Sequence, residues 1–137
     1  MQNVTLLTTN ETDRGQADDL LLKEELLRRG YCVQIKPWET LQDEGEDLFI
    51  IRSTWNYTDR YDDFLKCIQS LDNRLWNPLP LVKWNSNKKY LIELFDKNFQ
   101  VIPLQLARDS KSLENAIDDL GGNEFIVKPL VGAGSRG

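Results

Sequence analysis

The first half of the chain alternates between short apolar runs and longer segments of mixed polarity. The runs at 3–8, 31–35 and 48–51 are β-favouring or wholly apolar, and they predict strands. The segments 14–29 and 58–71 predict helices, and in the second one the apolar residues recur at spacings of three and four. Because strands and helices alternate, we expect right-handed βαβ units and a small parallel sheet.

Local signals mark the ends of these elements. Gly30 stands where a helix C-cap belongs, and Thr58 can cap the second helix. Leucines lie on several sides of 14–29, so we expect that helix to be covered on more than one side. Two prolines predict an extended connector without helix over 76–80.

The second half predicts two further helices and two further strands. The helices are expected at 86–97 and 110–120, and the strands at 101–106 and 124–127. The connector marks the expected domain boundary. It divides the chain into an α/β domain over 1–80 and the beginning of a second domain over 81–137.

Composition narrows the class of protein. Hydrophobic residues make up 40% of the 137 residues and charged residues 28%, as in globular domains. No apolar run approaches the length of a membrane span, so we expect no membrane partner. The N-terminus lacks the basic and apolar regions of a signal peptide. We therefore expect a cytoplasmic protein in which Cys32 and Cys67 are free thiols.

Charge and residue usage exclude further functions. Residues 1–50 hold 11 acidic and 5 basic side chains, and this acidic balance argues against a nucleic-acid partner. Residues 51–137 hold 11 acidic and 12 basic side chains, with local basic groups that could serve a small anionic ligand. The chain has no histidine, which excludes Ser-His-Asp and Cys-His hydrolases and removes a common metal ligand. The acidic segment 39–47 lacks the carboxylate spacing of calcium loops, so we interpret it as a solvated turn. We expect no metal site in this chain.

The strongest chemical signal lies near the C-terminal end of the sequence. Lys128 closes the strand expected at 124–127, and Gly132, Gly134 and Gly137 follow in a loop that also contains Ser135. Glycine allows backbone N–H groups to approach an anion closely, and the lysine adds a positive charge. The spacing fits G-x-G-x-x-G, but the helix and acidic residue of a dinucleotide site do not follow. The alternative is a flexible glycine-rich segment with no ligand.

Two other positions carry candidate chemistry. Lys88 and Lys89 fall in the first turn expected for helix 86–97, where cations are unfavourable unless an anion lies nearby. The alternative is that both side chains extend into water. Arg52 and Trp55 directly follow a strand, where open α/β sheets bind ligands, and an arginine there suits a carboxylate or phosphate. Alternatively, Trp55 fills the core and Arg52 pairs with a nearby acid.

These segments, taken in order, resemble the ATP-grasp superfamily of carboxylate–amine ligases related to glutathione synthetase and D-alanine–D-alanine ligase. The stretches 52–57 and 76–78 resemble the bacterial subgroup that includes the D-cycloserine-forming ligase. The stretch 84–91 resembles the opening of the grasp domain, whose lysine reaches the nucleotide phosphates. The stretch 125–137 resembles the second lysine and the phosphate-covering loop.

The resemblance implies a fold, ligands and a reaction. It implies a Rossmann-like pre-ATP-grasp domain, followed by an incomplete first subdomain of the ATP-grasp fold. ATP with magnesium would activate a small-molecule acid as an acyl phosphate, which an amine or thiol then attacks. Phosphate contacts would come from Lys88, Lys128 and the glycine loop, and substrate contacts from Arg52 and Trp55. Such ligases continue into an adenine hinge and magnesium ligands that this chain lacks, so we expect it to be inactive alone.

Other functions stay open. The chain could be a shortened, non-catalytic homologue that binds a partner protein or a small acid, or an unrelated dinucleotide-binding fragment. We also expect a homodimer. In relatives, later strands would cover the apolar faces of helices 86–97 and 110–120, and strand 124–127 would otherwise be an open apolar edge that recruits another chain.

Overall fold

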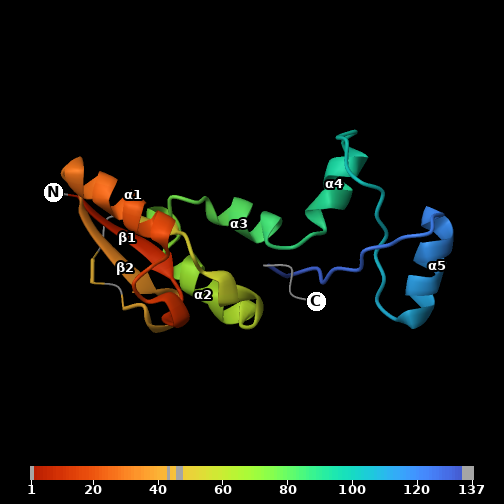
Figure 1. Ribbon diagram of the computed structural model, residues 1–137, viewed down its shortest axis with the longest axis horizontal. Coiled ribbons are helices and arrows are strands. Elements are labelled where there is room, and N and C mark those ends of the chain that lie inside the picture. Colours follow the sequence, from red (N-terminus) through yellow and green to blue (C-terminus); the bar gives the residue numbers. More distant parts are fainter. Residues whose placement is uncertain (1, 43, 46–47, 134–137) are drawn as a thin grey trace.

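A three-stranded parallel sheet organises the N-terminal half of the chain. The structure is a computed structural model that describes residues 2–42, 44–45 and 48–133. Within these residues, strands β1 (Asn3–Thr8), β2 (Cys32–Pro37) and β3 (Leu48–Ile51) lie in the order β2-β1-β3. Figure 1 shows β1 and β2 side by side. Both neighbours run parallel to β1. The prediction of a mixed α/β chain with a small parallel sheet is confirmed.

Helix α1 (Ala17–Arg28) covers one face of the sheet. Its Leu22 and Leu26 pack against Val4, Leu6 and Val33, which are buried. The expectation that α1 is covered on more than one side is wrong, because a single sheet face contacts it. The other leucines of the helix are exposed: Leu20, Leu21 and Leu27. Gly30 ends the helical segment with a φ of 87°, as expected for a residue in the left-handed region.

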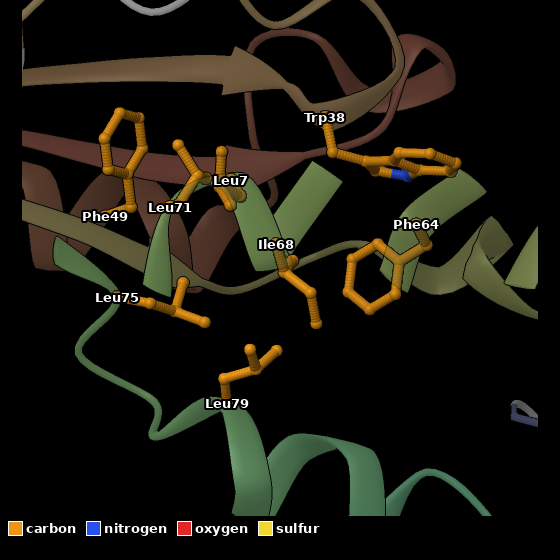
Figure 2. Close-up of a cluster of buried hydrophobic side chains, with 8 residues drawn as sticks. All are labelled: Leu7, Trp38, Phe49, Phe64, Ile68, Leu71, Leu75 and Leu79. Carbon is orange, nitrogen blue, oxygen red and sulfur yellow. The ribbon is translucent and has the colours of Figure 1, made fainter. Parts of the chain in front are cut away.

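Helix α2 (Tyr61–Ser70) and the segments after it cover the other face. Figure 2 shows the eight buried side chains of this larger core: Leu7, Trp38, Phe49, Phe64, Ile68, Leu71, Leu75 and Leu79. Trp38 and Phe64 meet edge to face, with ring centroids 5.4 Å apart. The apolar spacing predicted for the second helix therefore identifies the residues that it buries. Thr58 is not its cap, because Thr58 ends a separate 3-10 helix, Trp55–Thr58, and the N-cap is Arg60.

The expectation that the connector 76–80 contains no helix is wrong. Helix α3 (Leu79–Asn85) begins inside it, with Pro80 in the first turn. Proline is compatible with that position, because the first N–H groups of a helix have no acceptor within the helix. Leu79 is buried in the larger core, and Val82 packs against it. The boundary predicted at residue 80 remains a prediction, but α3 packs with the N-terminal core.

The second half holds two more helices, α4 (Tyr90–Asp96) and α5 (Ser110–Leu120), which lie away from the sheet (Figure 1). The helix expected at 86–97 therefore begins four residues later, and Lys88 and Lys89 precede it. Helix α5 has the predicted bounds, and Asp109 caps it by accepting from Ser112 N at 2.8 Å.

The expected strands 101–106 and 124–127 do not form, since neither belongs to a sheet within the described residues. A strand needs a hydrogen-bonded neighbour. Both segments instead line a groove of about 460 Å³ beside α5. Several of their apolar side chains are exposed: Ile102, Phe125, Ile126 and Val127.

Candidate functional site

The structure places Arg52 directly after β3, at the carboxyl edge of the sheet, in an ion-pair network. Its Nη2 donates to Asp18 Oδ2 at 2.8 Å, and its Nε donates to Asp19 Oδ1 at 2.9 Å. The Arg52 side chain is 32% exposed, whereas that of Asp19 is only 1% exposed. The guanidinium is therefore held by carboxylates of the chain itself, as in the alternative interpretation of this residue. Trp55 does not fill the core, because it is 54% exposed.

Asp19 joins the start of α1 to the end of β3. Its Oδ2 accepts from Gln16 N at 3.0 Å, completing a capping box, and also from the Ser53 hydroxyl. Burial raises the pKa of Asp19. The hydrogen bonds from Ser53, Gln16 and Arg52 outweigh that effect and hold the pKa below its ordinary value of 3.8. The carboxylate is thus ionised near neutral pH and ties two elements together.

A small pocket lies beside the segment that follows β3, and Thr54 and Tyr57 of that segment line it. Its volume is about 220 Å³, and its walls come from the end of β3, helix α2 and helix α3. The lining combines three apolar side chains with five neutral polar ones: Ile51, Phe64, Val82, Thr54, Tyr57, Asn77, Asn85 and Ser86. Sequence analysis missed this grouping, although it counts 52–57 and 76–78 as characteristic stretches. The signal that could have predicted the pocket is that 52–57 directly follows a parallel strand, where open α/β sheets bind ligands.

Hydrogen bonds join the elements that form the pocket walls. Ile51 N donates to Asn77 Oδ1 at 2.9 Å, which fixes the connector to the end of β3. The hydroxyl groups of Tyr61 and Ser86 share a hydrogen bond of 2.6 Å, which joins α2 to the end of α3. The ring of Tyr57 packs on Phe64 with centroids 5.3 Å apart. Burial, followed by the neighbouring Tyr61, raises the pKa of Tyr57, so its hydroxyl is protonated near neutral pH.

Lys88 and Gly132, two of the predicted nucleotide-binding residues, are in contact. Lys88 Nζ donates to Gly132 O at 3.0 Å, and Lys88 N donates to Leu130 O at 2.8 Å. Gly132 packs so closely that a Cβ there would lie 2.8 Å from Pro129 Cγ. Within the described part of the chain, the N–H groups of residues 131–133 have no acceptor. The turn before α4 therefore holds a glycine loop with unused donors beside an ammonium group.

The other predicted nucleotide contacts are Lys128, Gly134, Ser135 and Gly137, and of these the structure describes Lys128. Lys128 is exposed on the extended segment that lines the groove beside α5. It is four residues from Gly132, which limits the separation of the two Cα atoms to about 14 Å. Gly134, Ser135 and Gly137 lie outside the described residues.

Two general features complete the description. Among residues 2–42, 44–45 and 48–133, no group of three or more Cys, Asp or Glu side chains is placed to hold a metal ion. None of the helices in that part of the chain is long and apolar enough to cross a membrane.

Comparisons with known proteins point to one biosynthetic protein. The chain is 28% identical to the cycloserine biosynthesis protein DcsG of Streptomyces lavendulae, over 78% of this chain and 39% of that protein. Its fold matches the crystal structure of D-cycloserine synthetase DcsG with a TM-score of 0.84 and 26% identity, over 96% of this chain and 47% of that one. The chain thus spans less than half the length of these relatives.

The family model describes the N-terminal domain of D-cycloserine synthetase DcsG. It matches residues 4–77, which contain β2, β3, α1, α2 and all of β1 except its first residue, Asn3. That match covers 74 of the 137 residues, more than half of the chain. The chain therefore belongs to the family of the D-cycloserine synthetase DcsG N-terminal domain.

Proposed function

We propose that the chain forms the N-terminal part of an ATP-dependent ligase of the ATP-grasp type, which joins a small acid to an amine. In this reaction the γ-phosphoryl group of ATP passes to the carboxylate, giving ADP and an acyl phosphate. The amine then attacks the acyl carbon and phosphate leaves. Similarity to a protein named a synthetase supports this class of reaction.

The contact between Lys88 and the glycine loop is the observation that carries the proposal. It joins two segments that are 44 residues apart and that the family resemblance assigned separately to nucleotide phosphates. An ammonium group beside free backbone N–H groups is the donor set that phosphate oxygens need. On binding, Lys88 would exchange the Gly132 carbonyl for a phosphate oxygen, and the N–H groups of the loop would cover the phosphates. Lys128 would supply a second positive charge.

Magnesium accompanies ATP in such reactions and neutralises the phosphate charge. The described residues hold no acidic cluster that could bind it. In this part of the chain, the phosphate charge would therefore be met by Lys88 and Lys128.

Calorimetric titration of the chain with MgATP tests the proposal. Lys88→Met should weaken binding by about 1.5–3 kcal/mol, roughly 10- to 150-fold, because a charge-assisted hydrogen bond is lost. Lys89→Met is the matched control, since Lys89 is the exposed neighbouring lysine, and it should bind like the unmodified chain. Equal losses in both variants, or no binding by the unmodified chain, would instead favour the non-catalytic module.

A further inference from the structure

We propose that the pocket between β3, α2 and α3 binds an uncharged amide or hydroxyl group of the substrate. The inference deepens the proposed function and rests on it for the statement that the ligand is a ligase substrate. The pocket itself is a feature of the described residues, and neither the sequence motifs nor the comparisons assign it a ligand.

The lining selects against charge. None of the eight side chains around the pocket is ionised near neutral pH, because they are aliphatic, aromatic, hydroxyl or amide groups. A carboxylate or ammonium group placed there would find no opposite charge among the lining side chains. An amide or alcohol loses far less hydration and can regain its hydrogen bonds.

The polar groups present both donors and acceptors to the pocket. Asn77 uses its carbonyl oxygen on Ile51 N, and within the described chain no acceptor takes its amide NH₂ group. Ser86 Oγ donates to Lys83 O at 3.2 Å, so it accepts the hydrogen bond from the Tyr61 hydroxyl and keeps one lone pair. Tyr57 and Asn85 also line the pocket, and a hydroxyl and an amide group added to this set would satisfy both the oxygen and the NH₂ of an amide.

Size and position agree with a substrate fragment. The volume of about 220 Å³ is below the roughly 300–1,000 Å³ of sites for larger ligands, so a whole nucleotide does not fit. Ser86 lies two residues before Lys88, which places their Cα atoms within about 7 Å of each other. A substrate anchored here by its uncharged end lies beside the turn that carries the proposed phosphate contact. Its reacting carboxylate then lies outside the pocket.

An NMR titration of the ¹⁵N-labelled chain without nucleotide tests the inference. The probes are propionamide and propionate, which have the same shape but differ in charge. We expect propionamide to shift the resonances of Thr54, Asn77 and Ser86 with millimolar affinity, and propionate to bind at least tenfold more weakly. Equal affinity for the two probes, or shifts that map elsewhere, would overturn the inference, as would no shift at all.

Two variants separate a binding role from a general effect on the fold. Tyr57→Phe removes one hydroxyl from the pocket and should weaken propionamide binding about 2- to 10-fold. Tyr31→Phe makes the same chemical change on the opposite face of the sheet, where Tyr31 packs against the smaller core, and should leave the affinity unchanged. If Tyr57→Phe perturbs the whole spectrum, Asn85→Leu at the exposed rim replaces it, with exposed Asn73→Leu as its control. Unchanged affinity in the pocket variant contradicts the inference.

The two proposals can fail separately. Amide binding without MgATP binding would leave the pocket established and the ligase assignment refuted. MgATP binding without amide binding would do the reverse.

Discussion

The ammonium nitrogen of Lys88 lies 3.0 Å from the carbonyl oxygen of Gly132, and the backbone N–H of the same lysine donates to Leu130 O at 2.8 Å. One residue thus holds the glycine loop twice, once through its side chain and once through its main chain. The loop is thereby placed against the turn before α4, although 44 residues separate the two segments.

Gly132→Ala should displace this loop. The added Cβ would lie 2.8 Å from Pro129 Cγ and 3.5 Å from Lys88 Nζ, and the proline ring has little freedom to move away. Hydrogen exchange at the amide of Lys88, which donates to the loop, should become faster. Gly122→Ala is the control, because its Cβ would come no closer than 3.7 Å to its nearest neighbour. Similar exchange in both variants would show that the close packing at Gly132 is not needed.

Asp19→Asn should destabilise the N-terminal half. The change removes the charge that pairs with Arg52 and one acceptor from a site that is 1% exposed, at a cost of about 2–4 kcal/mol. Asp18→Asn removes the other partner of Arg52, but that carboxylate is 68% exposed, so about 0–1 kcal/mol is expected. Urea denaturation followed by circular dichroism measures both. Equal losses of unfolding free energy in the two variants would show that the burial of Asp19 does not increase its contribution to stability.

The same carboxylate predicts a dependence of stability on pH. The pKa of Asp19 is lowered in the folded chain, so its contribution is fully present above the unfolded value near 3.8. The contribution is lost as the pH falls through the lower folded value. The difference in unfolding free energy between the unmodified chain and Asp19→Asn should therefore shrink from about pH 6 to about pH 3. A difference that grows on acidification would contradict the assignment.

Leu79→Ala tests how far the N-terminal core extends. Leu79 is 7% exposed in the larger core, and its truncation should cost about 2–5 kcal/mol through lost burial and a cavity. Leu81→Ala, on the same helix at a residue that is 52% exposed, should change stability by no more than about 0.5 kcal/mol. If thermal unfolding shows that both are neutral, α3 contributes nothing to the core and packs independently of it.

The expected homodimer remains a prediction with a direct test. Ile126 and Val127 are 82% and 72% exposed beside the apolar groove, and a second copy that covered them would bury this surface. Ile126→Lys should then reduce self-association in sedimentation velocity, whereas Leu21→Lys, at an exposed leucine of α1, should not. A compact monomer at high micromolar concentration for the unmodified chain would show that the prediction is wrong.

Local patterns predicted the elements whose own residues carry a clear signal. Strands β1, β2 and β3 and helix α5 follow from apolar runs, spacing and glycine, since each of these signals acts over a few residues. The segments 101–106 and 124–127 have the composition of strands, but strand formation depends on a distant neighbour that composition does not reveal. Pro80 was misinterpreted for a related reason, since the effect of a proline depends on where the helix begins.

The candidate site was predictable only in part. Lys88 and Gly132 could be chosen because a lysine and a glycine loop are typical of phosphate binding, but their contact depends on tertiary structure. Arg52 was chosen by its place after a strand, and that reasoning cannot show that Asp18 and Asp19 already hold its guanidinium. The polar pocket escaped prediction because Thr54, Asn77 and Ser86 are neutral residues from three separate segments.

An NMR titration of the ¹⁵N-labelled chain with MgATP tests the central claim most directly, because it shows where a nucleotide binds as well as whether it does. The account predicts that the largest shifts fall on Lys88 and on residues 130–133. It also predicts that Lys88→Met moves the titration midpoint to roughly 10- to 150-fold higher MgATP, while Lys89→Met leaves it unchanged. Shifts confined to the sheet edge around Arg52, or none at saturating MgATP, would contradict the account.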